Sequence, residues 1–502
     1  MRRDLDRLAT EHFDLLVVGA GGHGVFAAAD ASRRGLRVAL VDAGDIGGAT
    51  TGNSLRTMHG GVRYLQYLQL GRTLESIREQ ALLRAMAPDY TEALPFLMPS
   101  SGWGLRGPLG LFAGLNIHQA LRLATTHGIN GGQHLPRSRV LSRTRYTERV
   151  PGIDVEHLSG GALWHEVQLL DSGALCVALA QEAARQGACV ANYVRVDALN
   201  YQGERCRGAR CTDVLTGAAL NIEAAHTLNA AGPWATDFYT ATAPVKPLPV
   251  ALNDSMNVLL RERLFEGQAV AIPSSRRVEG EAVAAANRMY FAVPWRGRTV
   301  VGTVQERWVD GPTCVRDHPH HLAAFLADLN GAMPAAGLTA DDVAHVYWGR
   351  VPTEDAPTET GELRRNAREV IDHRERDGVG GLHTIVGVKL TTARAVAEQA
   401  IDAVVQESDR AFVAGDTAAL RLPPPPQDLS RPSAEAFAAR AALRERLELA
   451  QREEMVLCRD DFLLRRTDLG VLGSWAELSA AARELIAATL PEGPAPLVHS
   501  HP

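Results

Sequence analysis

The sequence predicts an α/β protein whose first domain is built on a parallel β-sheet. Three observations support this: an apolar run at residues 14–18, a glycine-rich turn directly after it, and an alanine-rich helical stretch at 25–34. Strand, turn and helix in this order form the unit from which parallel sheets are assembled. A chain of 502 residues is too long for one compact core, so two or three domains are expected.

The turn has the G-x-G-x-x-G spacing of a dinucleotide-binding site. A second strand, residues 36–41, ends at Asp42, about 20 residues after the glycines. Glycines let the backbone approach a pyrophosphate at the helix N-terminus, and Asp42 can accept a hydrogen bond from a ribose hydroxyl. The cofactor-binding glycines predicted here are Gly19, Gly21, Gly22 and Gly24.

A second strand and helix, near residue 385, favour FAD over NAD as the dinucleotide. Apolar residues lead to Gly387 and Lys389, and Thr391 and Thr392 begin a helix. A helix N-terminus offers N–H groups and a positive dipole to the negative charge of a reduced flavin. The alternative is an ordinary helix with Thr391 or Thr392 as its N-cap, which gives no reason for Lys389.

Composition and charge exclude several classes of protein. The 58 acidic residues outnumber the 52 Lys and Arg residues, and the net charge of -6 argues against a nucleic-acid partner. An anionic ligand must therefore be bound by local arginines. The six cysteines are scattered, and the closest pair, Cys206 and Cys211, has no second pair nearby, so we predict reduced thiols.

No metal site is predicted. The run from Asp317 to His321 holds three histidines, but it lacks partners at a fitting spacing. We interpret it as a solvated helix start before Leu322.

The apolar segments indicate a cytoplasmic protein. Residues 1–8 lack the apolar segment of a secretory signal, and no run of about 18 apolar residues could span a membrane. Residues 95–118 are apolar and glycine-rich. Two interpretations of this segment stay open: a peripheral contact with a bilayer surface, or internal packing or a lid over a pocket.

Five sequence blocks follow one another along nearly the whole chain. They are HGGVRYL at 59–65, NAAGPW at 229–234, PWRGRTVVGT at 294–303, GVKLTT at 387–392, and residues 454–461 with 464–467. Together they resemble the FAD-dependent glycerol-3-phosphate dehydrogenases, within the D-amino-acid-oxidase-like flavoprotein group. The resemblance implies FAD as cofactor, a Rossmann-like FAD-binding domain with a parallel sheet, an interleaved antiparallel-β substrate domain and a short C-terminal helical cap.

The resemblance also suggests how the chain is divided. The FAD-binding domain takes residues 12–80, 150–245 and 350–410, and the substrate domain takes 81–149 and 246–349. A stiff, proline-rich linker at 411–432 leads to the helical domain at 433–502.

By the same resemblance, a substrate pocket lies beside the flavin. His59 is the predicted proton acceptor, because an imidazole with an ordinary pKa of roughly 6.5 suits this role at neutral pH; a structural histidine bonded to backbone is the alternative. Lys389 is expected to stabilise the alkoxide or the reduced flavin by charge. Arg63, Arg350 and Arg365 are expected to bind a phosphate or carboxylate, because a guanidinium bonds two oxygens at once.

Other predicted cofactor contacts come from the matched blocks and their neighbours. They are Thr50, Ser54, Gly60, Gly61, Ala231, Gly232, Gly387, Lys389, Leu390 and Thr391.

Two departures from the family concern the substrate pocket. Family members carry a K-G-x-H-like stretch with a histidine near the substrate, whereas residues 250–257, around Met256, hold no histidine. Their G-V-R-P-L-like run places an arginine on the substrate phosphate, whereas Arg350 is displaced by one position, a slip that turns a side chain to the other face of a strand. Arg364 or Arg365 is the candidate for a second phosphate-binding arginine.

These observations predict an FAD-dependent enzyme that oxidises a secondary alcohol by hydride transfer to flavin N5, most like sn-glycerol 3-phosphate to dihydroxyacetone phosphate. The expected substrate is a small anion, and the electron acceptor is a quinone, oxygen or a carrier protein. Two other classes stay open: an amine or amino-acid oxidase of the same fold, and a flavin-binding accessory protein.

Overall fold

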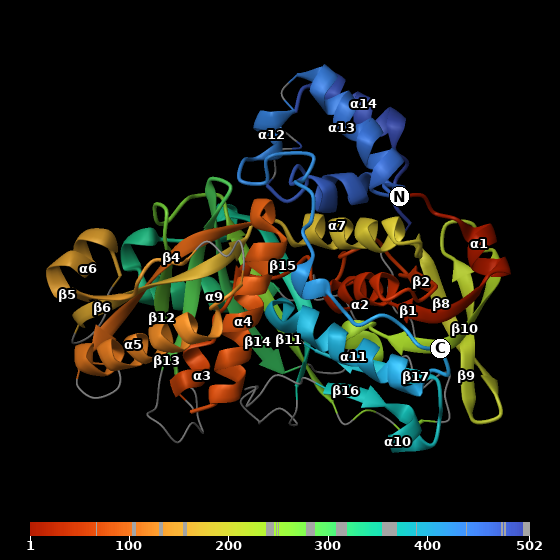
Figure 1. The fold of residues 1–502 in the computed structure, drawn as a ribbon. Coiled ribbons are helices and arrows are strands. Elements are labelled where there is room, and N and C mark those ends of the chain that lie inside the picture. The colour runs from red at the N-terminus through yellow and green to blue at the C-terminus, as the bar shows by residue number, and fades with distance from the viewer. Residues whose placement is uncertain are drawn as a thin grey trace.

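Two β-sheets and a C-terminal group of helices form the protein, as the computed structural model shows (Figure 1). The structure describes residues 1–66, 68–102, 107–129, 134–153, 158–236, 245–246, 248, 250–277, 287–307, 319–353, 369–387, 389–437, 439–472, 475 and 478–494. Each sheet combines strands from distant parts of the sequence, so the chain passes between the two sheets several times.

The first sheet is the predicted parallel one. Its strands lie in the order β16-β17-β10-β1-β2-β7; neighbours from β17 to β7 are parallel, and β16 is antiparallel at the edge. The strands are β1 (His12–Val18), β2 (Val38–Val41), β7 (Cys189–Ala191), β10 (Ala219–Asn229), β16 (Glu369–Asp372) and β17 (Leu382–Val386). A hairpin of β8 (Val194–Gln202) and β9 (Arg205–Asp213) continues from β10.

Helices cover one face of this sheet. They are α2 (Gly22–Arg33), α7 (Ser172–Arg185) and α11 (Ala393–Glu407). The alanines of α2 are fully buried between α7, α11 and the strands, because small side chains let the helices approach closely. The opposite face is covered by α1 (Leu5–Thr10) and the β8–β9 hairpin.

The second sheet is antiparallel except where β4 and β12 pair in parallel. Its strands are β3 (Thr57–Met58), β4 (Thr91–Ser101), β5 (Arg139–Ser142), β6 (Leu158–Leu169), β11 (Ala251–Leu260), β12 (Ala269–Arg277), β13 (Asn287–Trp295), β14 (Arg298–Arg307) and β15 (Val343–Thr353). β3 and β6 fall within ranges that the sequence assigns to the FAD-binding domain, but they pair in this sheet. The domain boundaries stay a prediction, and this pairing places part of 50–60 and 158–169 with the substrate sheet.

Further helices surround the second sheet and connect the two. They are α3 (Val62–Gln66), α4 (Leu70–Met86), α5 (Pro108–Thr125), α6 (Arg143–Arg149) and α9 (Pro319–Ala332). The short helix α10 (His373–Asp377) instead joins β16 to β17 in the first sheet. Short 3-10 turns are η1 (Pro88–Tyr90), η3 (Gly232–Ala235), η5 (Pro334–Ala336), η6 (Ala340–Asp342), η7 (Leu390–Thr392) and η8 (Thr417–Ala419). α9 begins at Pro319, which agrees with the helix start predicted there; residues 317 and 318 lie outside the described residues.

The helical cap (residues 433–494) packs its own apolar core. It contains α12 (Ser433–Ala436), α13 (Arg440–Glu453), a π-helix at Asp461–Arg466 and α14 (Ala480–Thr489). Leu443, Leu447, Phe462 and Ile486 are buried in its centre.

Buried ion pairs attach the cap to the first sheet. Asp45, in the loop after β2, is bonded by Arg465 at 2.6 Å and by Arg466 at 2.8 and 2.9 Å. Burial opposes ionisation of Asp45, but the two guanidiniums outweigh it and lower the pKa of Asp45 to about 2. The stabilisation from this carboxylate is therefore complete above its ordinary pKa of 3.8 and is lost as the pH falls through about 2.

We expect Arg466→Met to lower the free energy of unfolding by roughly 3 kcal/mol, because it leaves Asp45 buried with one guanidinium fewer. Urea unfolding would measure the loss. As a control, Arg452→Met removes an exposed partner of Glu453 in the same cap and should cost no more than about 0.5 kcal/mol. Equal effects of the two substitutions would contradict the role given to Asp45.

Candidate active site

The glycine turn and two of the matched blocks meet at one edge of the first sheet. In the parallel ladder, Val18 lies opposite Asn229, and Asn229 lies opposite Thr384. The segments that follow these strands therefore leave the sheet side by side: 19–24, 230–234, and 387 with 389–392. Ligands of open parallel sheets bind at this kind of edge, beyond the carboxyl ends of the strands.

Close backbone packing explains two of the predicted glycines. Gly19 has a φ of +104°, and a Cβ there would lie 2.5 Å from the Ala230 carbonyl oxygen. A Cβ at Gly24 would lie 1.7 Å from the Gly19 carbonyl oxygen. Gly21 is different, because the atom nearest to its Cβ position is Thr51 Oγ1 at 3.4 Å. The first and last glycines thus fix the turn, while Gly21 leaves the N-terminus of α2 accessible to a ligand, which fits a dinucleotide pyrophosphate.

Asp42 holds the adjacent turn. Its carboxylate accepts hydrogen bonds from the backbone N–H groups of Ala20 at 2.6 Å and Gly44 at 2.8 Å. Burial raises the pKa of Asp42 despite these two bonds. The ribose contact predicted for Asp42 stays a prediction, and the structure adds a second role for the residue in joining the glycine turn to the end of β2.

The loop at 50–54 connects the two sheets. Thr50 donates a hydrogen bond from Oγ1 to the Arg350 carbonyl oxygen at 3.2 Å, and Asn53 donates to the Trp348 carbonyl oxygen at 2.5 Å. Asn257 in turn donates to the Asn53 carbonyl oxygen at 2.9 Å. Sequence reasoning missed Asn53 and Asn257, because an isolated asparagine carries no motif.

The stretch without a histidine, around Met256, has both a core residue and a loop contact. Met256 is fully buried in the core of the second sheet, and the next residue, Asn257, bonds the loop. The position in β11 that faces the loop therefore carries an amide. Arg350 lies on β15, opposite Asp254 of β11 in the ladder, and its side chain is half-buried.

A buried carboxylate organises the HGG segment. Glu166, on β6, accepts hydrogen bonds at Oε2 from the backbone N–H of Gly60 and from Gln80, both at 2.7 Å. Its Oε1 accepts a bond from Trp164 at 3.0 Å and lies 3.9 Å from His59 Nδ1. Glu166 was not predicted from the sequence, since it belongs to no motif and only strand pairing places it here.

The charge of Glu166 is retained despite its burial. Burial favours the protonated form, but the neighbouring His59, the charge of Arg122 and the Gly60 N–H outweigh it and lower the pKa of Glu166 to about 2. His118 donates from Nε2 to the Gly60 carbonyl oxygen at 2.8 Å, so both backbone polar groups of Gly60 are bonded. The segment is fixed by side chains from three other elements.

The imidazole of His59 is partly covered by neighbouring side chains and partly exposed. Its ring lies 6.0 Å from Phe96 and 6.1 Å from Phe291, measured between centroids, and the side chain is 42% exposed. Its Nδ1 faces Glu166, which leaves Nε2 for other contacts. Among the described residues, the neighbours of the ring are a carboxylate and two aromatic side chains, which favours a role in proton transfer over that of a histidine bonded only to backbone.

Lys389 lies against the same segment. Its Nζ is 4.0 Å from the ring centroid of Tyr64 in α3, a cation–π contact that joins the GVKLTT and HGGVRYL blocks. Thr391 bonds Met58 Sδ weakly at 4.0 Å, and a Cβ at Gly22 would lie 2.4 Å from a methyl carbon of Leu390. The N-cap position of α11 is Thr392, which makes no side-chain capping bond, so capping does not explain the two threonines.

The remaining residues that were predicted to contact the cofactor or the substrate have the following contacts and backbone angles. Ser54 Oγ accepts a weak hydrogen bond from the Arg56 N–H at 3.4 Å, Ala231 donates its N–H to Asn229 Oδ1 at 3.0 Å, and Gly232 has a φ of +60°. Gly61 has a φ of +82°, and a Cβ at Gly387 would lie 2.4 Å from His23 Nε2. The Arg63 backbone belongs to α3, while its side chain and the whole of Arg365 lie outside the described residues.

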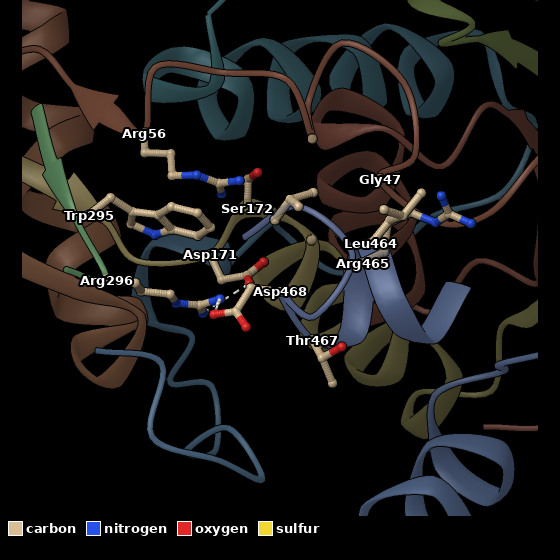
Figure 2. Close-up of a pocket in the computed structure, with 13 residues that line it drawn as sticks. Gly47, Arg56, Asp171, Ser172, Trp295, Arg296, Leu464, Arg465, Thr467 and Asp468 are labelled. Carbon is tan, nitrogen blue, oxygen red and sulfur yellow. Dashed lines mark hydrogen bonds and ion pairs between the residues drawn. The ribbon is translucent and has the colours of Figure 1, made fainter. Parts of the chain in front are cut away.

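A small pocket lies elsewhere, where the cap meets both sheets (Figure 2). Arg56 lies there 4.1 Å from the ring centroid of Trp295, and Arg296 bonds Asp468 of the cap at 2.7 Å and Asp171 at 3.2 Å. Burial opposes the charge of Arg56, but Tyr347 and Asp171 raise its pKa overall. The lining includes neither His59 nor Lys389, so we interpret this pocket as part of the cap junction.

Comparison with known proteins agrees with the geometry. Residues 14–403 match the family described as FAD dependent oxidoreductase. The chain is similar to "Glycerol-3-phosphate dehydrogenase" of Synechocystis sp., with 29% identity over 80% of this chain and 71% of that protein. It is 30% identical to the Mycobacterium leprae protein of the same name over 80% of this chain, which spans 64% of that protein.

A solved structure has a similar fold. It is the glycerol-3-phosphate dehydrogenase from Bacillus halodurans complexed with FAD, with a TM-score of 0.68, 23% identity, and coverage of 96% of this chain and 92% of that one. At this level of identity, the similarity concerns the fold.

We expect Gly24→Ala to abolish FAD retention, because the added Cβ would meet the Gly19 carbonyl oxygen and separate α2 from the end of β1. The measurement is the ratio of flavin to protein absorbance after gel filtration. Gly71→Ala, in α4, is the matched control: no atom lies within 4 Å of its Cβ position, so FAD content should be unchanged and stability should rise by up to about 1 kcal/mol. Full FAD content in Gly24→Ala would contradict the packing argument.

Proposed function

The chain belongs to the family of FAD-dependent oxidoreductases, and we propose that it is a dehydrogenase of sn-glycerol 3-phosphate or a closely related anionic secondary alcohol. Relatives carrying the name glycerol-3-phosphate dehydrogenase support this substrate class. The observation that carries the proposal is the contact of Lys389 with Tyr64, which brings a motif more than 300 positions later in the sequence against the segment in which His59 is held beside buried Glu166.

His59 is the proposed proton acceptor. Nδ1 faces the Glu166 carboxylate at 3.9 Å, so the imidazole takes the hydroxyl proton at Nε2. The buried negative charge then stabilises the imidazolium that forms. When bound, FAD supplies the hydride acceptor at N5, so loss of the proton and the hydride converts the alcohol to a ketone.

Cationic side chains bind the anion and stabilise the developing negative charge. Lys389 lies beside the HGGVRYL segment, and its charge is suited to the alkoxide oxygen. Arg350 is the proposed anchor for the phosphate, because the loop at Thr50 holds its backbone near the cofactor edge. Arg63 and Arg365 are proposed as further anchors on the resemblance of their motifs alone.

The cofactor is proposed to contact the edge described above. The N-terminus of α2, with Gly21 and Thr51, would hold the pyrophosphate, and Asp42 would bind the ribose. The HGG segment and the N-terminus of α11 would hold the flavin, and the N–H groups of α11 would complement its negative charge. The remaining residues proposed to line this cofactor site are Gly19, Gly22, Gly24, Thr50, Ser54, Gly60, Gly61, Ala231, Gly232, Gly387, Leu390 and Thr391.

Substrate choice can be read from the colour of the flavin. In anaerobic stopped flow, we expect glycerol 3-phosphate to bleach the visible flavin absorbance, and we expect glycine, proline and phosphate-free polyols to leave it unchanged. His59→Gln should retain FAD and slow the bleaching by at least roughly 100-fold, the usual contribution of a general base.

The matched control is His127→Gln, which removes an exposed histidine at the end of α5 and should bleach at the wild-type rate. Bleaching by an amino acid in place of glycerol 3-phosphate would assign the chain to the amine oxidases. If none of these compounds reduced the flavin, the accessory-protein alternative would be favoured. An unchanged rate in His59→Gln would remove this residue from the mechanism.

We further propose that the protein binds a membrane surface through α5 and takes a quinone as its acceptor. One face of α5 is buried through Leu111, Leu115, His118 and Arg122. The large apolar residues on the other face are exposed: Leu109 by 79%, Phe112 by 57%, Ile117 by 52% and Leu123 by 56%. The helix contains no acidic residue, and an exposed apolar face of this length fits an interfacial helix.

For residues 95–118, we propose that the α5 part contacts a membrane and that the β4 part is internal packing. The β4 part is packed against β6, while the outer face of α5 is open. Among the described residues, no helix is long and apolar enough to cross a bilayer, so the contact proposed is peripheral.

Phe112→Ser combined with Leu123→Ser should lower binding to liposomes at least roughly 10-fold, because each side chain loses the free energy of leaving water. Co-sedimentation with phosphatidylglycerol-containing vesicles measures this, and reduction by glycerol 3-phosphate in solution should be unaffected. Leu215→Ser, an exposed leucine in the turn between β9 and β10, is the control. Wild-type binding by the double variant would exclude α5 as the membrane surface.

A further inference from the structure

A second group of chemically active side chains lies far from the flavin edge. It consists of His226 on β10, His383 on β17 and Glu407, the last residue of α11. Their side chains are only 4%, 0% and 3% exposed. None of them is used in the proposed reaction.

Three donor atoms face one another in this cluster. Glu407 Oε2 lies 3.2 Å from His383 Nε2 and 3.7 Å from His226 Nδ1, and the donor atoms all lie within 4.8 Å of one another. His226 Nδ1, His383 Nε2 and Glu407 Oε2 have no hydrogen-bond partner outside the cluster among the residues that the structure describes. Buried polar atoms with so few partners are costly, so the arrangement favours a cation shared by the three donor atoms.

Ser408 determines which nitrogen of His226 carries the proton. The Ser408 hydroxyl donates to the Val404 carbonyl oxygen at 2.7 Å, so its only hydrogen is used there. Toward His226 Nε2, at 3.2 Å, the same oxygen must accept a hydrogen bond. Neutral His226 is therefore protonated at Nε2, and the lone pair of Nδ1 points toward Glu407.

The other oxygen of Glu407 is held separately. Oε1 accepts the backbone N–H of Gly381 at 2.9 Å and lies 3.4 Å from Arg205 Nη1. A carboxylate with one oxygen bonded to protein donors and the other directed at two imidazoles has the outer contacts typical of a metal ligand.

We propose that His226 Nδ1, His383 Nε2 and Glu407 Oε2 bind a divalent transition-metal ion, with Zn²⁺ as the best match. Two imidazoles and one carboxylate are ligands that zinc accepts, and a water molecule completes a tetrahedron. Ligand atoms of a tetrahedral zinc site are about 3.3 Å apart, so the side chains need only small shifts.

The site is distinct from the proposed catalytic one. Glu407 lies sixteen positions after Thr391 along η7 and α11, which is roughly 24 Å of helix. The metal would join β10, β17 and the C-terminal end of the helix whose other end faces the flavin. We therefore infer a structural role, fixing α11 on the sheet.

These ligands have no recognisable spacing in the sequence, which is why no metal site is predicted from it. His226 and His383 are 157 positions apart and become neighbours only through the pairing of β10 with β17.

Metal content tests the proposal on the purified holoenzyme. After removal of metal with a chelator and equilibrium dialysis against Zn²⁺, mass spectrometry should find about one zinc ion per chain in the wild type. His226→Gln and Glu407→Gln should bind Zn²⁺ at least roughly 10-fold more weakly, with FAD absorbance as the check on folding. His12→Gln is the matched control, since it removes the exposed histidine of a His–Glu pair at the start of β1 and should bind like the wild type.

The Ser408→Ala variant tests whether the three side chains bind a metal or only pack against one another. It leaves all three ligands in place but removes the acceptor that fixes the His226 tautomer, so Zn²⁺ affinity should fall roughly 10-fold. No binding by the wild type, or wild-type stoichiometry and affinity in both ligand variants, would overturn the proposal. If those variants do not fold, anomalous scattering at the zinc edge from wild-type crystals decides: a peak between the three side chains supports the site, and its absence refutes it.

Discussion

Parallel pairing on both sides of β10 is the constraint on which the proposed active site depends. Because Val18, Asn229 and Thr384 are aligned, three segments separated by more than 150 residues leave the sheet at one edge. The alignment also requires glycine at position 19, where any Cβ would meet the Ala230 carbonyl oxygen. Gly19 is therefore required for the packing of β1 against β10, and this packing in turn forms the proposed cofactor site.

Buried carboxylates do much of the positioning around this edge. Asp42 holds the glycine turn, Glu166 holds the HGG segment, and Asp45 holds the cap. Each is bonded by N–H donors or guanidiniums that offset the cost of removing it from water, at least in part. For Glu166 and Asp45 the balance favours the charged form, as their lowered pKa values indicate. The charge beside His59 is thus constant across the physiological pH range.

Helix α11 connects two features of the first domain. Its N-terminal end follows Lys389 and packs near the HGG segment, and buried Arg394 pairs with Glu79 of α4 at 2.7 Å. Its C-terminal end carries Glu407 beside two histidines of the sheet. A helix fixed at both ends holds its N–H groups in a constant position, which suits a site that must present them to a cofactor.

The sequence alone determined the fold class, the cofactor and the motifs of the first sheet, because these depend on local patterns: an apolar strand, a glycine turn, a helix start. It also indicated His59 and Lys389 as members of one pocket, through their motifs. The partners that position them, Glu166, Asn257 and Asn53, were decided by the tertiary structure, as was the cluster of His226, His383 and Glu407. These residues belong to no local pattern, and their roles arise from strand pairing and helix packing between positions that are far apart in the chain.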